Sequence, residues 1–200
     1  MSTTTRTPPS TSGWRTVDIL VAAVLAVATG VVFFAWNQLY AAVEPLFTAF
    51  PPASAVMYPV WLVPGVIGGL VVRKPGAAVF TSVVAALVSA LLGNQWGLIT
   101  VASGLVQGLL PEVVFALGRY RRWGLATAVL AGAAAGGLGA APLDLTIYFT
   151  DWSGTWMAAY AAIVTVAGAV AGWLAWLFVR ALARSGVLSS FASGREQASV

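Results

Sequence analysis

The fold is decided by residues 98–143, which read LITVASGLVQGLLPEVVFALGRYRRWGLATAVLAGAAAGGLGAAPL. Two apolar runs, 98–117 and 125–143, are separated by a short segment that holds three arginines. Each run is close to the ~20 residues that a helix needs to cross ~30 Å of hydrocarbon. The stretch therefore predicts two membrane spans joined by a basic loop.

The same alternation of apolar and polar segments extends in both directions. Four further apolar runs cover residues 17–36, 56–72, 77–92 and 156–179. We therefore predict an all-α integral membrane protein with six transmembrane helices within residues 14–184. Residues 1–13 are rich in Ser, Thr and Pro and are predicted to be a disordered tail. Residues 185–200 are predicted to be a flexible tail.

The composition indicates a protein that is surrounded by lipid. Hydrophobic residues make up 60% of the 200 residues and charged residues only 8%, whereas a soluble domain carries roughly 25% charged residues. The net charge of +4 is compatible with nucleic-acid binding. However, the basic residues lie in short segments beside apolar runs, which is typical of a membrane protein. We therefore predict that this chain lies in membrane lipid and does not bind nucleic acid.

The positions of the basic residues predict the orientation. All ten fall on one side of a six-span arrangement; they are Arg6, Arg15, Arg73, Lys74, Arg119, Arg121, Arg122, Arg180, Arg184 and Arg195. The three loops on the other side hold Glu44, Asp144 and Asp151 and no Lys or Arg. Because cytoplasmic loops carry the excess of basic residues, both termini are predicted to be cytoplasmic.

Missing residue types exclude several classes of chemistry. The chain has no Cys and no His, which excludes disulfides, thiolate nucleophiles, the usual zinc sites and Ser–His–Asp catalysis. The Gly-rich stretch 132–139 lacks the Lys-Ser/Thr of a phosphate-binding loop. We predict no catalysis, no cofactor and no metal. If the protein moves a solute uphill by ATP, the ATPase must be another chain.

Glu112 is an acid inside the apolar run 98–117. A carboxylate in hydrocarbon costs on the order of 3 kcal/mol, so it should face the bundle interior and have a partner. One interpretation is a contact to a ligand or cation. The other is a structural carboxylate that reaches toward Arg119 or caps a neighbouring helix.

Amides and indoles supply the other candidate contacts. Gln107 lies near mid-membrane, where it can bind a ligand or make a helix–helix hydrogen bond. Two glycines flank Asn94, Gln95 and Trp96. The indole can stack on a flat ring, and the two amides can hydrogen-bond to the edge of that ring. Alternatively, this segment anchors a tight turn at the membrane interface. Trp61 offers a second stacking surface or plain packing.

Two further segments flank these candidates. Residues 37–55 form the longest connection and are predicted to be an external lid. The last outer loop is flanked by Asp144, Tyr148, Asp151 and Trp152, which are predicted to form a solvated rim rather than a site.

Six short segments, taken in order, resemble the YkoE family. They are YPVW (58–61), RKPGAA (73–78), GNQWG (93–97), SGLVQG (103–108), EVVFA (112–116) and YRRW (120–123). Members of this family are substrate-binding (S) components of energy-coupling factor transporters. The resemblance runs from about residue 17 to residue 195.

The resemblance implies a function and partners. S components are six-helix proteins of the bacterial cell membrane that capture a vitamin from outside. They dock on a transmembrane coupling (T) subunit that is driven by two cytosolic ATPase subunits. The YkoE type is associated with thiamine or its hydroxymethylpyrimidine precursor. The family's docking stripe of small residues would fall on Ala22 and Ala26, which with Gly30 follow a four-residue spacing.

We therefore predict a substrate-binding subunit of a vitamin uptake transporter, and not an enzyme. The predicted substrate contacts are Trp61, Asn94, Gln95, Trp96, Gln107 and Glu112. Glu112 lies ~20 Å from residues 94–96 by helical rise, so one small ligand is expected to touch the outer residues and Gln107 first. The alternatives are a proton-coupled secondary transporter that uses Glu112, and a membrane enzyme or assembly factor.

Overall fold

The structure is a computed structural model, which describes residues 13–189 and 191–195. The described part is built from helices. They are α1 (Thr16–Val43), η1 (Glu44–Phe47), η2 (Pro51–Met57), α2 (Pro59–Val72), α3 (Ala77–Leu91), α4 (Ile99–Leu117), α5 (Leu125–Ala134), η3 (Ala135–Ala140), α6 (Ala141–Ile147), α7 (Gly154–Arg184) and α8 (Ala192–Arg195). The prediction of an all-α fold is therefore confirmed for the described residues.

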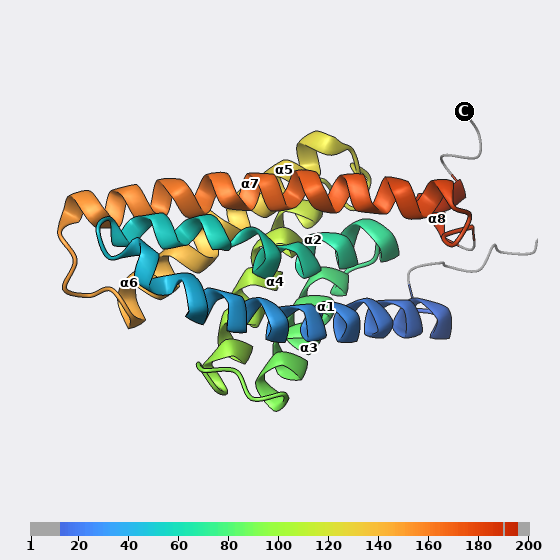
Figure 1. The fold of residues 1–200 in the computed structure, drawn as a ribbon. Coiled ribbons are helices and arrows are strands. Elements are labelled where there is room, and N and C mark those ends of the chain that lie inside the picture. Colours follow the sequence, from blue (N-terminus) through green and yellow to red (C-terminus); the bar gives the residue numbers. More distant parts are fainter. Residues whose placement is uncertain (1–12, 190, 196–200) are drawn as a thin grey trace, which may run out of the picture.

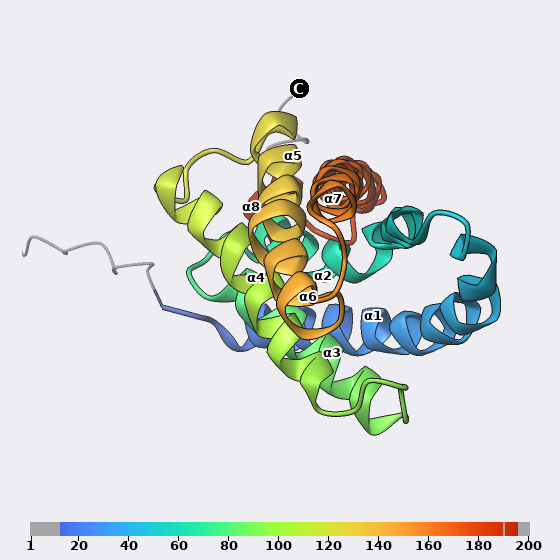
Figure 2. The same ribbon diagram turned by 90° about the vertical axis from the view of Figure 1, so that its left-hand side faces the viewer.

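Five helical stretches are long and apolar enough to cross a membrane. They are Thr16–Phe47, Pro51–Val72, Ile99–Leu117, Leu125–Ile147 and Gly154–Arg184. The sixth predicted span forms α3, an apolar helix of 15 residues. That length corresponds to about 22 Å, less than the ~30 Å of hydrocarbon. Figures 1 and 2 show that α3 and α4 lie side by side and run at a steep angle to α1 and α7.

Helix α2 lies at the centre of the bundle. Every residue from Pro64 to Val72 is buried, and the helix packs against α1, α3, α4 and α7. A helix that is apolar on all sides is expected in such a position. Glycines let its neighbours approach closely, since a Cβ on Gly69 would lie 2.2 Å from the ring of Phe115.

Helices α5 and α7 meet backbone to backbone. A Cβ on Gly168 would lie 2.2 Å from the carbonyl oxygen of Gly132, and a Cβ on Gly172 would lie 2.1 Å from that of Ala128. The small residues of the fifth apolar run thus serve close helix packing, as is common in membranes. The run includes the π-helix η3, and α6 extends it beyond its predicted end at residue 143 to Ile147.

The small-residue stripe of α1 faces the chain's own interior. Ala22 and Ala26 are fully buried, and α1 packs along α3. A Cβ on Gly30 would lie 2.7 Å from the carbonyl oxygen of Ala85 in α3. The docking role that the resemblance implies for Ala22 and Ala26 is not supported by this placement, because these side chains already pack against neighbouring helices.

An ion-pair cluster holds the start of α1. The fully buried Asp18 carboxylate lies 2.8 Å from Arg15 Nη2 and 2.8 Å from Lys74 Nζ. Trp14 Nε1 also donates to the carbonyl of Pro75 at 2.9 Å. These contacts tie the start of α1 to the loop between α2 and α3. The start of α1 and the end of α7 lie at the same end of the molecule (Figure 1).

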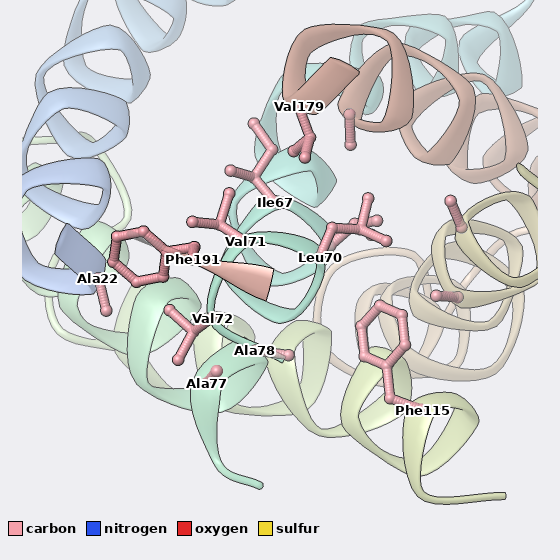
Figure 3. Packing of buried hydrophobic residues seen from close by; sticks show 14 of the residues in the cluster. Ala22, Ile67, Leu70, Val71, Val72, Ala77, Ala78, Phe115, Val179 and Phe191 are labelled. Carbon is pink, nitrogen blue, oxygen red and sulfur yellow. The ribbon is translucent and has the colours of Figure 1, made fainter. Parts of the chain in front are cut away.

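Two tail and loop predictions need correction. Residues 185–189 and 191–195, predicted as part of a flexible tail, fold back onto the bundle: Leu188 and Phe191 are buried in the main core. Figure 3 shows Phe191 beside Ala22 and Val71. Ser193 Oγ donates to the carbonyl of Val71 at 3.2 Å. Residues 37–55, predicted as one long connection, are mostly helical and belong to α1, η1 and η2.

Candidate substrate-binding site

A partly open cavity of about 200 Å³ lies near the C-terminal end of α1. It is enclosed by residues from α1, η1, η2, α2, α3, α4, α6 and α7 and from the connections that follow α3 and α6. Aromatic side chains dominate its wall; they are Phe33, Tyr40, Tyr58, Trp61, Trp96, Tyr148, Phe149 and Tyr160. Such a wall suits a flat, unsaturated ligand.

Three of these rings contact one another. The ring centroids lie 5.5 Å apart for Tyr40 and Trp61, 5.6 Å for Tyr40 and Trp96, and 5.7 Å for Trp61 and Trp96. The rings come from α1, α2 and the loop between α3 and α4, so the cavity wall depends on the packing of three segments. The predicted stacking residues Trp61 and Trp96 are thus brought together.

Polar contacts fix the orientation of Trp61. Its Nε1 donates to Asn37 Oδ1 at 2.8 Å, and Asn37 Nδ2 donates to Ser89 Oγ at 3.0 Å. Asn37 and Ser89 are both buried. Because a buried polar group needs its partner, these two hydrogen bonds hold the indole of Trp61 in one position before any ligand binds.

Asp144 supplies a buried carboxylate to the cavity. It is 5% exposed, and it accepts hydrogen bonds from the hydroxyls of Tyr58 and, at 2.6 Å, of Tyr160. No Lys or Arg lines this cavity among the described residues. The negative charge is therefore stabilised by phenol hydroxyls rather than by a cation, which favours a ligand with a positive charge or an amine.

The prediction that Asp144 belongs to a solvated rim is wrong. The fifth apolar run was expected to end at residue 143, but the helix continues to Ile147 and carries Asp144 into the interior. An acid inside a membrane helix is a functional candidate by default. The signal that could have found Asp144 was the apolar pair Leu145 and Ile147 just beyond it.

The three predicted amide contacts differ in whether they line the cavity. Gln107 is 7% exposed and lines the cavity, as does the exposed Gln95. An amide carries both donors and an acceptor, so it can pair with the edge of a heterocycle. Asn94 does not line the cavity: its Oδ1 accepts from the backbone N–H of Trp96 at 2.9 Å and from Thr100 Oγ1 at 3.1 Å. Asn94 thus shapes the turn that presents Trp96.

Glu112 lies outside the cavity and caps α3. Its carboxylate accepts the backbone N–H groups of Gly76 at 2.8 Å and Ala78 at 2.9 Å, two donors that a helix start leaves without an internal partner. The hydroxyl of Tyr120 donates to it at 2.7 Å. Burial and the Glu112 carboxylate raise the pKa of Tyr120 to about 12, so this hydroxyl keeps its proton. The geometry supports the structural interpretation of Glu112.

We expect Glu112→Ala to lower the free energy of unfolding by about 2 kcal/mol, because two backbone donors at the start of α3 lose their acceptor. Affinity for a ligand in the cavity should be unchanged. Thermal unfolding in detergent and calorimetric titration measure the two quantities. Tyr120→Phe is the matched control, since it removes only the phenol hydrogen bond. Lost affinity at unchanged thermal stability would restore the ligand interpretation.

Comparison with known proteins identifies the family of this chain. A family model described as "ABC-type cobalt transport system, permease component" matches residues 17–138. The "Putative HMP/thiamine permease protein YkoE" of Bacillus subtilis (strain 168) is 31% identical over 185 residues, which cover 92% of each chain. The chain belongs to the YkoE family. A crystal structure of an S component of an energy-coupling factor transporter matches with a TM-score of 0.88, at 30% identity over 94% of each chain.

Membership in the YkoE family confirms the resemblance that the six sequence segments indicated. Relatives of this chain are transporter components and not enzymes. The chain is accordingly a multi-pass membrane protein with the fold of an S component.

Proposed function

We propose that this chain is the substrate-binding subunit of an ATP-driven vitamin transporter in the bacterial cell membrane, and that it captures thiamine or its hydroxymethylpyrimidine precursor. The name of the YkoE relative and the likeness to an S component support this assignment. Its partners would be a T subunit and two cytosolic ATPase subunits. Six spans with both termini in the cytoplasm would place the cavity at the outer side.

The observation that carries the choice of ligand is the combination of an aromatic wall with Asp144. Thiamine contains a cationic thiazolium and an aminopyrimidine. Aromatic faces attract a cation, and a buried carboxylate strengthens that attraction or accepts the amine. Gln107 and Gln95 can pair with ring nitrogens. The proposed substrate contacts are Trp61, Gln95, Trp96, Gln107 and Asp144.

Calorimetric titration of the purified chain against thiamine, hydroxymethylpyrimidine and Co²⁺ tests this function. The cobalt arm is included because the family description names a cobalt transport system. We expect saturable binding of thiamine, its precursor or both, and no saturable binding of Co²⁺. Binding of Co²⁺ alone would overturn the proposal.

Replacing Trp96 tests the aromatic wall. Trp96→Ala should weaken binding of thiamine about ten-fold, because it removes the contacts of Trp96 with the ligand and with Trp61. Trp156→Ala is a matched control, since Trp156 does not line the cavity. Equal affinities of the two variants would remove Trp96 from the site.

The energy source separates this proposal from a secondary transporter. Uptake of thiamine into liposomes should require co-reconstituted T and ATPase subunits together with ATP. Uptake by the chain alone, driven by a proton gradient, would contradict the proposal. Impermeant labelling of a single cysteine at Glu44 should succeed only from outside the cell if the predicted orientation holds.

A further inference from the structure

The connection between α3 and α4 includes the loop 93–97, which carries Trp96 and lies at one edge of the molecule (Figure 1). Both ends of this loop are glycines in the left-handed region, with a φ of 92° at Gly93 and 60° at Gly97, where other residues are strained. Within the loop only Asn94 and Trp96 are half-buried, and the remaining residues are exposed. The contacts of these two residues therefore hold the loop, and with it the indole, in place.

Ser89 is the point at which this loop meets α1. Ser89 is fully buried near the end of α3. Its Oγ accepts a hydrogen bond from Asn94 Nδ2 at 3.3 Å and another from Asn37 Nδ2 at 3.0 Å. All three residues stand outside the wall of the substrate cavity. One buried hydroxyl thus joins the loop to α1 from behind that wall.

Each of the two amides uses its oxygen to hold a tryptophan. Asn37 Oδ1 accepts from Trp61 Nε1 at 2.8 Å, and Asn94 Oδ1 accepts from the backbone N–H of Trp96 at 2.9 Å. A continuous hydrogen-bond network therefore connects the two tryptophans, and Ser89 is its midpoint. The two indole rings lie 5.7 Å apart in the cavity wall. A buried polar network whose members are all satisfied favours one arrangement of the groups around it.

We propose that Ser89 is a positioning residue that holds Trp61 and Trp96 together in the arrangement that binds the substrate. This inference rests on the proposed function, since it requires that both indoles contact thiamine. A wall that is ordered in advance loses less conformational freedom on binding, which raises affinity. Because movement of the loop breaks the hydrogen bond between Asn94 and Ser89, bound substrate is also released more slowly.

Hydrogen exchange of the ligand-free chain in detergent tests this role in the variant Ser89→Ala. Alanine keeps the helix and leaves the two amides without their shared acceptor. We expect the backbone amides of residues 93–97 to exchange about ten-fold faster, and those of α3 before residue 89 to be unchanged. An increase as large throughout α3 as in the loop would show a merely structural role and overturn the proposal.

Ser82→Ala is the matched control for this variant. Ser82 is a second buried serine of α3 and does not line the cavity. Its replacement should leave exchange in the loop unchanged. Equal exchange of residues 93–97 in the two variants would contradict the proposal.

Calorimetric titration with thiamine supplies the second readout. Ser89→Ala should weaken binding about ten-fold, whereas Ser82→Ala should not. Combining Ser89→Ala with Trp96→Ala should weaken binding by less than the product of the two single losses, because Ser89 acts in part through Trp96. Losses that multiply would overturn the proposal. Absence of thiamine binding by the parent chain would overturn the proposed function, and the exchange measurement would still decide whether Ser89 holds the loop.

Asn94→Ala keeps the test decisive where Ser89→Ala fails to fold. It breaks the link between the loop and Ser89 and leaves the buried pair of Asn37 and Ser89 intact. We expect the same faster exchange in residues 93–97 and a weaker affinity for thiamine. Exchange and affinity equal to those of the parent chain would overturn the proposal.

Discussion

Asp144→Asn should lower the affinity for thiamine about 10- to 100-fold, because a hydrogen bond or ion pair with a charged group in a buried site contributes about 1.5–3 kcal/mol. Asparagine has nearly the same shape and can still accept a hydrogen bond from Tyr160, which donates to Asp144 at 2.6 Å. The change therefore removes the charge and keeps the cavity wall. Calorimetric titration of the purified variant measures the effect.

The stability of this variant is a second readout. Burial of the Asp144 carboxylate without a lining cation costs free energy, so removing its charge should not lower stability. The unfolding temperature of the ligand-free variant should therefore be close to that of the parent. Asp151→Asn is the matched control, because Asp151 is exposed and does not line the cavity. Unchanged thiamine affinity of Asp144→Asn in a folded variant would exclude Asp144 from the site.

Gly168→Leu should destabilise the bundle by more than about 3 kcal/mol. Any Cβ at this position would lie 2.2 Å from the carbonyl oxygen of Gly132, and a backbone atom cannot move aside as a flexible side chain can. Helices α5 and α7 would have to separate, which is beyond the 1–3 kcal/mol typical of an overpacked core. Thermal unfolding in detergent and the yield of monodisperse protein measure the loss.

A control for this prediction lies on the same helix. Ala162→Leu introduces the same side chain at an exposed position of α7 and should change stability by less than about 0.5 kcal/mol. If Gly168→Leu proved as stable as Ala162→Leu, the close contact between α5 and α7 would be disproved.

Much of the helical arrangement could be predicted from apolar runs and basic loops. Most predicted ends lie within a few residues of the observed ends, for example at residue 72 for α2 and at residue 117 for α4. Larger errors arose where helices continue past a polar residue, as α1 does through Asn37 to Val43. Asn37 is tolerated there because Ser89 and Trp61 satisfy its amide.

The candidate site shows the limit of reasoning from residue types. Trp61, Gln95, Trp96 and Gln107 were proposed from chemistry alone, and all four line one cavity. Glu112 had the strongest signal as an acid in an apolar run, yet its carboxylate caps α3. Which helix start lies opposite a carboxylate depends on how the helices pack, and the sequence does not encode that locally.

The sequence by itself determined that this chain crosses a membrane as a helical bundle, because apolar length and the placement of charge are properties of single segments. Only the tertiary structure decided which acid faces the cavity and which small residues face a neighbour. The two acids Asp144 and Glu112 differ in their surroundings rather than in the chemistry of their carboxyl groups. Those surroundings arise from contacts between residues that are far apart in the chain.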